Sequence, residues 1–94
     1  MKWTIEYRDF KPNTDLIRAL KHDLDQLIEK SPYASFTKMI LTQHGNEFHG
    51  LLQINSIHKK FISVATSGRI SDVANRLLTE IHDQLADWKI LRAV

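Results

Sequence analysis

The feature that most constrains the fold is a long amphipathic stretch near the end of the chain, RISDVANRLLTEIHDQLADWK, residues 69–89. Its apolar residues recur every three or four positions, so they fall on one stripe of a helix of about 20 residues. The stripe consists of Ile70, Val73, Leu77, Ile81, Leu85 and Trp88. Ser71 and Asp72 offer side-chain oxygens near the helix start. A stripe this long must be covered by a sheet or by another helix.

A second amphipathic helix is predicted between a break at residues 11–14 and Pro32. Asn13 or Thr14 can cap its N-terminus. The helix should run to about Lys30, because proline disfavours helical geometry in the residue before it. Its apolar stripe consists of Leu16, Leu20, Leu24, Leu27 and Ile28, with Ile17 beside them.

The remaining segments carry strand patterns. Residues 2–8 alternate polar and apolar side chains, which predicts a strand with one buried face. The alternation returns at Phe36, and Gly45-Asn46 suits a two-residue hairpin turn, because both residues tolerate a positive φ. That turn sets a register pairing His44 with Glu47, Gln43 with Phe48, Leu41 with Gly50 and Met39 with Leu52. Residues 60–67 are rich in β-branched and aromatic types and form a fourth strand.

These elements predict an α+β fold, a two-layer sandwich in the order β-α-β-β-β-α with a four-stranded sheet and both helices on one face. The double-stranded RNA-binding domains share this layout. The pattern leaves open whether the first strand lies beside the second or the fourth, and in which direction it runs. The solvated face of the hairpin is polar except for Ile40 and Leu51. The predicted core consists of Leu20, Leu24, Met39, Leu52, Ile54, Leu77, Ile81 and Leu85.

Composition limits the class of protein. A chain of 94 residues with 43% hydrophobic content predicts one small domain over residues 1–94. The absence of cysteine excludes disulfides and thiolate metal sites, and is compatible with a cytoplasmic location. The N-terminus lacks the pattern of a signal peptide, and no apolar run approaches the roughly 18 residues of a membrane span. A net charge of +2 permits an anionic partner without requiring one.

Catalytic and metal-binding patterns are weak. His44, His49 and Glu47 share one sheet face and have the donor types of a zinc site. The hairpin register, however, sets His49 opposite Thr42, so a polar sheet face is the simpler interpretation. The chain has no Gly-rich phosphate loop and no nucleophile elbow. We therefore expect no enzyme activity, no cofactor and no catalytic metal. The other histidines, which are His22, His58 and His82, are expected at the surface.

One resemblance emerges from the last helix. The order of elements, together with Gln84-Leu85 followed by Trp88-Lys89, resembles the short bacterial ribosome hibernation promoting factors and ribosome-associated inhibitors. Ile81 stands where that family has a leucine, and Trp88 matches its aromatic residue. The departures are Arg69 and Asn75 at usually acidic positions, Ser71 in place of an aromatic residue, and Glu80, Asp83 and Asp87 at usually basic positions.

The resemblance implies a stress-linked factor that modulates translation by binding the small ribosomal subunit. Members of this family place basic helix faces against ribosomal RNA in the channel used by messenger and transfer RNA. Each phosphate that a lysine or arginine neutralises releases counterions, which makes binding salt-dependent. On this basis the RNA-binding candidates are Arg18, Lys21, Lys30, Lys59, Lys60, Arg76, Lys89 and Arg92.

A second hypothesis follows from the acidic departures, because Glu80, Asp83 and Asp87 would repel RNA on the last helix. The chain would then be a non-enzymatic protein-interaction module that keeps the scaffold and has lost RNA binding. The sheet face around Ile40 and Leu51 could then pair with a protein partner or with a second copy.

Overall fold

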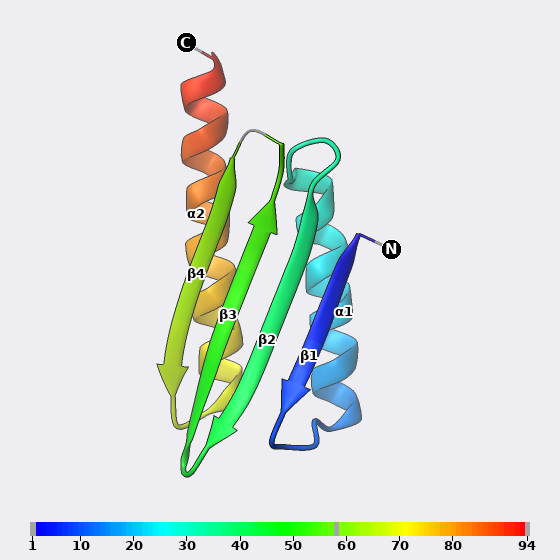
Figure 1. Ribbon diagram of the computed structural model, residues 1–94, viewed down its shortest axis with the longest axis vertical. Helices are drawn as coiled ribbons and strands as arrows, with labels where there is room; N and C mark the ends of the chain where they lie inside the picture. Colours follow the sequence, from blue (N-terminus) through cyan, green and yellow to red (C-terminus); the bar gives the residue numbers. More distant parts are fainter. Residues whose placement is uncertain (1, 58, 94) are drawn as a thin grey trace.

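The computed structural model describes the backbone of residues 2–57 and 59–93, and the side chains of these residues up to residue 91. It contains the predicted elements in the predicted order (Figure 1). They are β1 (Trp3–Arg8), α1 (Thr14–Lys30), β2 (Phe36–His44), β3 (Glu47–Asn55), β4 (Lys60–Ser67) and α2 (Ile70–Ala93). The α+β two-layer fold is thereby confirmed.

The sheet has the strand order β1-β2-β3-β4, so the first strand lies beside the second, which the sequence pattern had left open. β1 runs parallel to β2, and the other neighbours are antiparallel. α1 is therefore the crossover of a β-α-β unit, and such a crossover packs its helix onto the sheet it connects. Trp3 Nε1 on β1 donates a 2.7 Å hydrogen bond to Asp25 Oδ1 on α1, which ties the crossover together.

The β2–β3 hairpin has the predicted register, including His44 opposite Glu47 and Met39 opposite Leu52. Of the two turn residues, only Gly45 takes a positive φ, at 62°. Glycine at the first central position is the requirement of a type II′ turn, which matches the right-handed twist of the strands. The turn therefore depends on Gly45, and not on both residues as the sequence had suggested.

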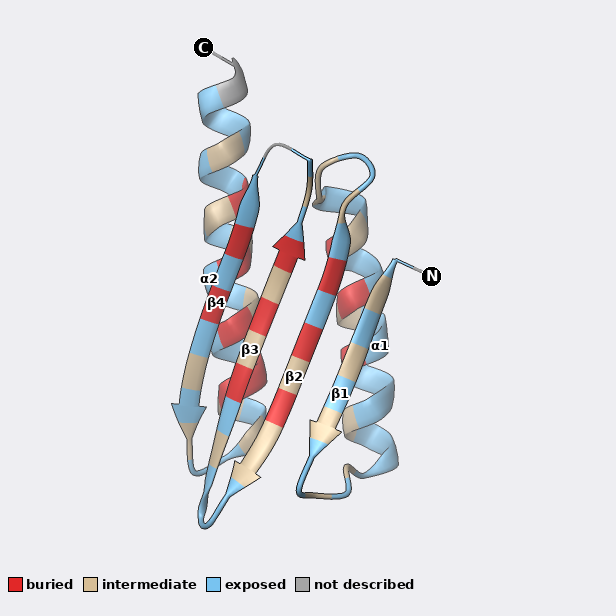
Figure 2. Ribbon diagram, in the orientation of Figure 1, coloured by how far each residue is buried: buried red, intermediate tan, exposed pale blue. Residues whose placement is uncertain are grey.

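Both helices cover the same face of the sheet, and the core lies between the two layers (Figures 1 and 2). Figure 2 shows buried residues alternating with exposed or intermediate ones along β2, β3 and β4. All eight residues of the predicted core are buried, and the structure adds Leu27, Leu41, Phe61, Val73 and Ala74. α2 packs closely against β3 at Gly50, where an added Cβ would lie 2.5 Å from Val73 Cγ1 and 2.6 Å from Leu77 Cδ1. A side chain at Gly50 would therefore push the two layers apart.

The helix ends agree in part with the sequence. Asn13 caps α1, because its Oδ1 accepts a 2.7 Å hydrogen bond from the Leu16 N–H. Ser71 lies inside α2, and Asp72 accepts a hydrogen bond from the Ser67 hydroxyl at 3.3 Å. α2, with 24 residues, is longer than the predicted helix of about 20 and continues beyond the amphipathic stretch to residue 93. No glycine or proline follows Lys89 to stop it.

The free edge of β4 is covered by side chains from α2. Gln84 spans the backbone of Ile62, since its Nε2 donates to the Ile62 carbonyl at 2.7 Å and its Oε1 accepts from the Ile62 N–H at 3.3 Å. Further along the strand, Arg76 Nη1 donates to the Thr66 carbonyl at 3.2 Å. Gln84 therefore makes the pair of bonds that an adjacent strand would make.

Candidate nucleic-acid interface

Four of the candidate cations gather at one end of the molecule, where α1 ends and β2 and β4 begin, which is the top of Figure 1 and is called here the upper end. They are Lys30, Lys59, Lys60 and Lys89, and all four are exposed. They come from α1, the start of β4 with the turn before it, and α2. The fold thus brings together cations that are far apart in the sequence.

Lys30 and Lys89 line a groove of about 490 Å³ between the end of α1 and the last turns of α2. The other lining residues are His82, Asp83, Leu85 and Ala86. The groove therefore combines two cations with one carboxylate and one titratable imidazole, so its net charge is positive. A phosphate group seated there would contact both lysines and would be opposed by Asp83.

The imidazole of His82 is partly buried in this groove. Its burial and the nearby Lys30 ammonium lower its pKa below the usual 6.5, with a further lowering from Lys89. The carboxylates of Asp23 and Asp83 act in the opposite direction and are outweighed. His82 is therefore biased toward its neutral form.

The two lysines before and at the start of β4 take different directions. Lys59 Nζ lies 5.5 Å from the centroid of the Phe61 ring, in a cation–π contact. Trp88 packs against the same ring with its centroid at 5.9 Å. Lys60 occupies a position facing away from the helices, because its neighbour Phe61 points into the core. Lys59 therefore extends the surface around α2, whereas Lys60 belongs to the open sheet face.

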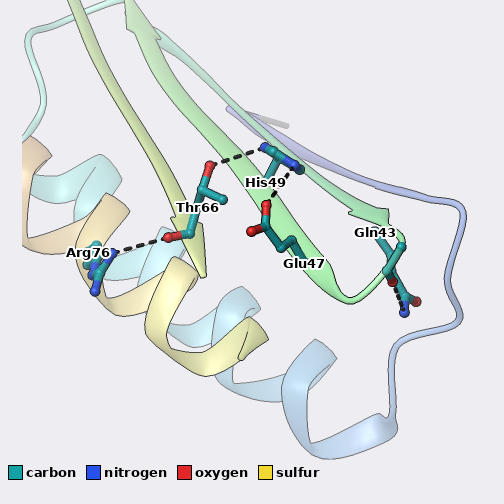
Figure 3. A network of polar contacts seen from close by, with 6 residues as sticks. Gln43, Glu47, His49, Thr66 and Arg76 are labelled. Atoms are coloured by element: carbon teal, nitrogen blue, oxygen red, sulfur yellow. Dashed lines mark hydrogen bonds and ion pairs between the residues drawn. The ribbon is translucent and has the colours of Figure 1, made fainter. Parts of the chain in front are cut away.

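The other candidates do not join this cluster. Arg18 and Lys21 are exposed on the first half of α1, toward the opposite end of the molecule. Arg76 lies near the start of α2 and is already bonded to the Thr66 carbonyl (Figure 3). The side chain of Arg92 lies outside the residues whose side chains the structure describes. The predicted set is therefore split, and no single helix face carries it.

The polar face near the hairpin turn has the contacts of a hydrogen-bonded sheet surface (Figure 3). His49 Nδ1 lies 3.1 Å from Thr66 Oγ1, and His49 Nε2 lies 3.8 Å from Glu47 Oε2. The His44 and His49 rings meet edge to face at 6.0 Å. Among the described residues, no group of three or more acidic or histidine side chains is placed to hold a metal ion. Of the other histidines, His22 is exposed, and His58 lies outside the described residues.

Charge is distributed unevenly between the two layers. The helices carry six Lys and Arg residues against eight Asp and Glu residues, whereas the rest of the chain carries seven against three. The excess positive charge therefore resides in the strands and turns. Lys38 on β2 is part of it and was absent from the predicted site, because a single cation in an alternating strand gives no signal of its own.

No protein-family model and no curated protein sequence matches the chain. Solved structures do match. The N-terminal domain of Protein Y from Thermus thermophilus aligns with a TM-score of 0.77 at 10% identity, covering 94% of this chain and 99% of that one. A ribosomal subunit interface protein from Coxiella burnetii aligns with a TM-score of 0.78 at 13% identity, covering 96% and 99%. This chain has the fold of the ribosomal subunit interface proteins.

The subunit interface fold extends over almost the whole of this chain and of both neighbours, so no large insertion distinguishes them. The fold expected from the resemblance of the last helix is thereby confirmed. In the described part of the chain, neither helix is both long enough and apolar enough to cross a membrane.

The lowered pKa of His82 predicts that folding stability depends on pH. Because the pKa of His82 is lower in the folded chain than the usual 6.5, the unfolded chain binds more protons as the pH falls below that value. Folding stability should therefore be unaffected by His82 above its usual pKa and should decrease as the pH falls through the range below it. Urea unfolding of the wild type and H82Q at about pH 7.5 and about pH 5.5 measures this. H82Q should lose less stability on acidification. An equal loss in both proteins would contradict the prediction.

Proposed function

We propose that this chain is a ribosome-associated, non-enzymatic factor of the hibernation type, which modulates translation by binding small-subunit ribosomal RNA in the cytoplasm. The observation that carries the proposal is the structural similarity, over nearly the full length of this chain, to two solved structures, one of which is of a protein named for the ribosomal subunit interface. Similar folds can serve different functions, so the surface of this chain has to support the same role.

The surface that supports RNA binding is the upper end, with Lys30, Lys59, Lys60 and Lys89. Lys30, Lys59 and Lys89 lie on the α2 side and can neutralise phosphates of one RNA segment, whereas Lys60 on the open sheet face would meet a neighbouring segment. These contacts add to affinity through counterion release. Arg18 and Lys21 on α1 can meet a second segment only if the RNA extends along that helix. Arg76 contributes less, because its guanidinium already bonds the Thr66 carbonyl.

A specific observation also favours the alternative, a protein-interaction module. Glu80, Asp83 and Asp87 are all exposed on α2, where they oppose an RNA phosphate and suit a basic protein surface. On the other side of the molecule, Val64 is 64% exposed on the open sheet face, beside the partly buried Leu51. These features describe surfaces that a protein partner or a second copy could cover.

Co-sedimentation with purified bacterial small ribosomal subunits tests the proposal. Four phosphate contacts, at a salt exponent of about 0.7 to 0.9 each, should weaken binding by about 50- to 150-fold between roughly 0.05 and 0.2 M salt. The chain should therefore pellet with the subunits at the lower salt and largely remain in the supernatant at the higher salt.

Two results would count against ribosome binding. One is a folded chain that fails to pellet with subunits at the lower salt. The other is association that is indifferent to salt, because an apolar or uncharged contact would lack the counterion term. Either result would leave the protein-interaction module as the function that the surface supports.

A further inference from the structure

The sheet face that the helices leave open is organised in rows that cross the strands. One row contains Phe36 on β2, Asn55 on β3 and Lys60 on β4, which are direct cross-strand partners. The next row contains Thr4, Lys38, Gln53 and Ile62. Six residues of these rows form the upper sheet patch, namely Phe36, Lys38, Gln53, Asn55, Lys60 and Ile62. The patch lies at the upper end and faces the viewer in Figures 1 and 2.

The upper sheet patch is basic. Its two rows carry Lys38 and Lys60 and, among the residues described, no Asp or Glu. The nearest acid on this face, Glu6 in the following row, is neutralised by Arg8, whose Nη2 lies 2.7 Å from Glu6 Oε2. The helical layer on the other side has more acids than bases. A polyanion that approaches the molecule is therefore attracted to the open face more than to the helices.

The patch also offers flat apolar surface. Phe36 is 41% exposed and Ile62 is 43% exposed, and each stands beside one of the lysines, Lys38 on β2 and Lys60 on β4. An exposed aromatic ring beside cations on a sheet suits single-stranded RNA. An unpaired base can stack its apolar face on the ring, and the charged phosphate linkages can contact the cations.

Between the two lysines lies a pair of amides. Gln53 Nε2 donates a 2.9 Å hydrogen bond to Asn55 Oδ1, which orients both side chains along β3. The other side-chain atoms, Gln53 Oε1 and Asn55 Nδ2, then remain as an acceptor and a donor for a base edge. With strands about 4.8 Å apart, Phe36 and Lys60 are separated by roughly 10 Å, so one or two nucleotides span the row.

We propose that the upper sheet patch binds single-stranded RNA, with a base stacked on Phe36, phosphates against Lys38 and Lys60, and a base edge against the Gln53 and Asn55 amides. This inference rests on the proposed function, because it assigns part of the ribosomal RNA contact to the open sheet face. A duplex cannot use the patch in this way, since its bases are stacked on each other and do not reach the ring.

The direct test is the affinity of the full chain for a labelled single-stranded RNA of about 12 nucleotides, measured by fluorescence anisotropy over a range of salt. F36A and F36L should each weaken binding by about five- to tenfold, because both remove the ring and F36L keeps an apolar side chain. K38Q/K60Q should lower the slope of log affinity against log salt by about 1.4, at about 0.7 for each phosphate contact on a single strand.

The matched control is K11Q/R69Q, which removes the same charge from two exposed loops at the opposite end of the molecule. If the sheet patch is the contact, this control should bind the RNA more tightly and with a steeper salt slope than K38Q/K60Q. If the two variants have the same affinity and salt slope, non-specific charge attraction is responsible and the inference is overturned. Wild-type affinity in folded F36A and F36L would overturn it as well. So would self-association of the wild type that F36A abolishes, because a second copy would then occupy the patch.

Co-sedimentation with small subunits separates this inference from the proposed function. If the wild type pellets with subunits and K38Q/K60Q and F36A pellet equally well, the sheet patch is not the contact and the proposed function stands. If the patch variants lose the oligonucleotide while the wild type fails to pellet, the patch binds RNA and the ribosomal role is wrong.

Discussion

Leu77→Ala should lower the free energy of unfolding by about 2 to 5 kcal/mol, the largest loss we expect from a single truncation in this chain. Leu77 is fully buried and packs against Gly50 of β3. Removing its side chain loses the transfer free energy of the buried atoms and leaves a cavity that a rigid sheet and helix cannot close. For a domain of this size, the melting temperature should fall by roughly 10 °C or more. Urea and thermal unfolding measure both quantities.

Leu91→Ala is the matched control for this prediction, because Leu91 is on the same helix and is 68% exposed. It should change the free energy of unfolding by no more than about 0.5 kcal/mol, as is usual for surface substitutions. Similar losses in the two variants would mean that α2 does not pack on the sheet through the stripe that contains Leu77.

The acidic residues of α2 should weaken ribosome binding, so replacing them with lysine should raise the affinity. D83K/D87K should strengthen binding to small subunits, because it removes two repulsive carboxylates and adds two cations next to Lys89. If both new lysines contact phosphates, the ratio of affinities between about 0.05 and 0.2 M salt should grow by roughly tenfold. Sedimentation with purified subunits at these two salts measures the change.

K59E/K60E provides the opposite charge change of equal size at the same end of the molecule. It should weaken binding and flatten the salt dependence, because it removes two contacts and adds repulsion. If neither variant changes the pelleted fraction, the upper end does not face RNA. If K59E/K60E binds more tightly than the wild type, the partner of this surface is a basic protein.

The fold was largely predictable from the sequence because each element carries a local signal. The 3.6-residue stripe of α2, the stripe of α1 and the alternation of the strands all survive in the structure with the expected burial. The hairpin register followed from the position of Gly45-Asn46, since a two-residue turn fixes every pair behind it.

Other features of the fold have no local signal. The place of β1 beside β2 is a choice between two edges of one sheet, and its side-chain alternation is the same in either case. The end of α2 could not be predicted, because no glycine or proline follows Lys89 as a stop signal and helix propensity alone does not define an end.

The candidate site was harder to predict than the fold. The candidates were chosen because each is basic, but the grouping of Lys30, Lys60 and Lys89 at one end depends on how α1, β4 and α2 are placed in space. The hydrogen bond from Arg76 to the Thr66 carbonyl likewise depends on how α2 packs beside β4. The excess of positive charge outside the helices is hard to see along the sequence, because its seven lysines and arginines are spread singly or in one pair over several strands and turns.

The hydrogen bonds between Gln84 and Ile62 have a consequence for how this protein behaves at high concentration. An uncovered edge strand is a template on which a second chain can add a strand, and repeated addition leads to fibrils. Because the amide of Gln84 occupies the backbone N–H and carbonyl of Ile62, an added strand would have to displace it in order to pair with β4 there. A residue that the family resemblance assigns to the RNA-binding helix thus protects the edge of the sheet at Ile62.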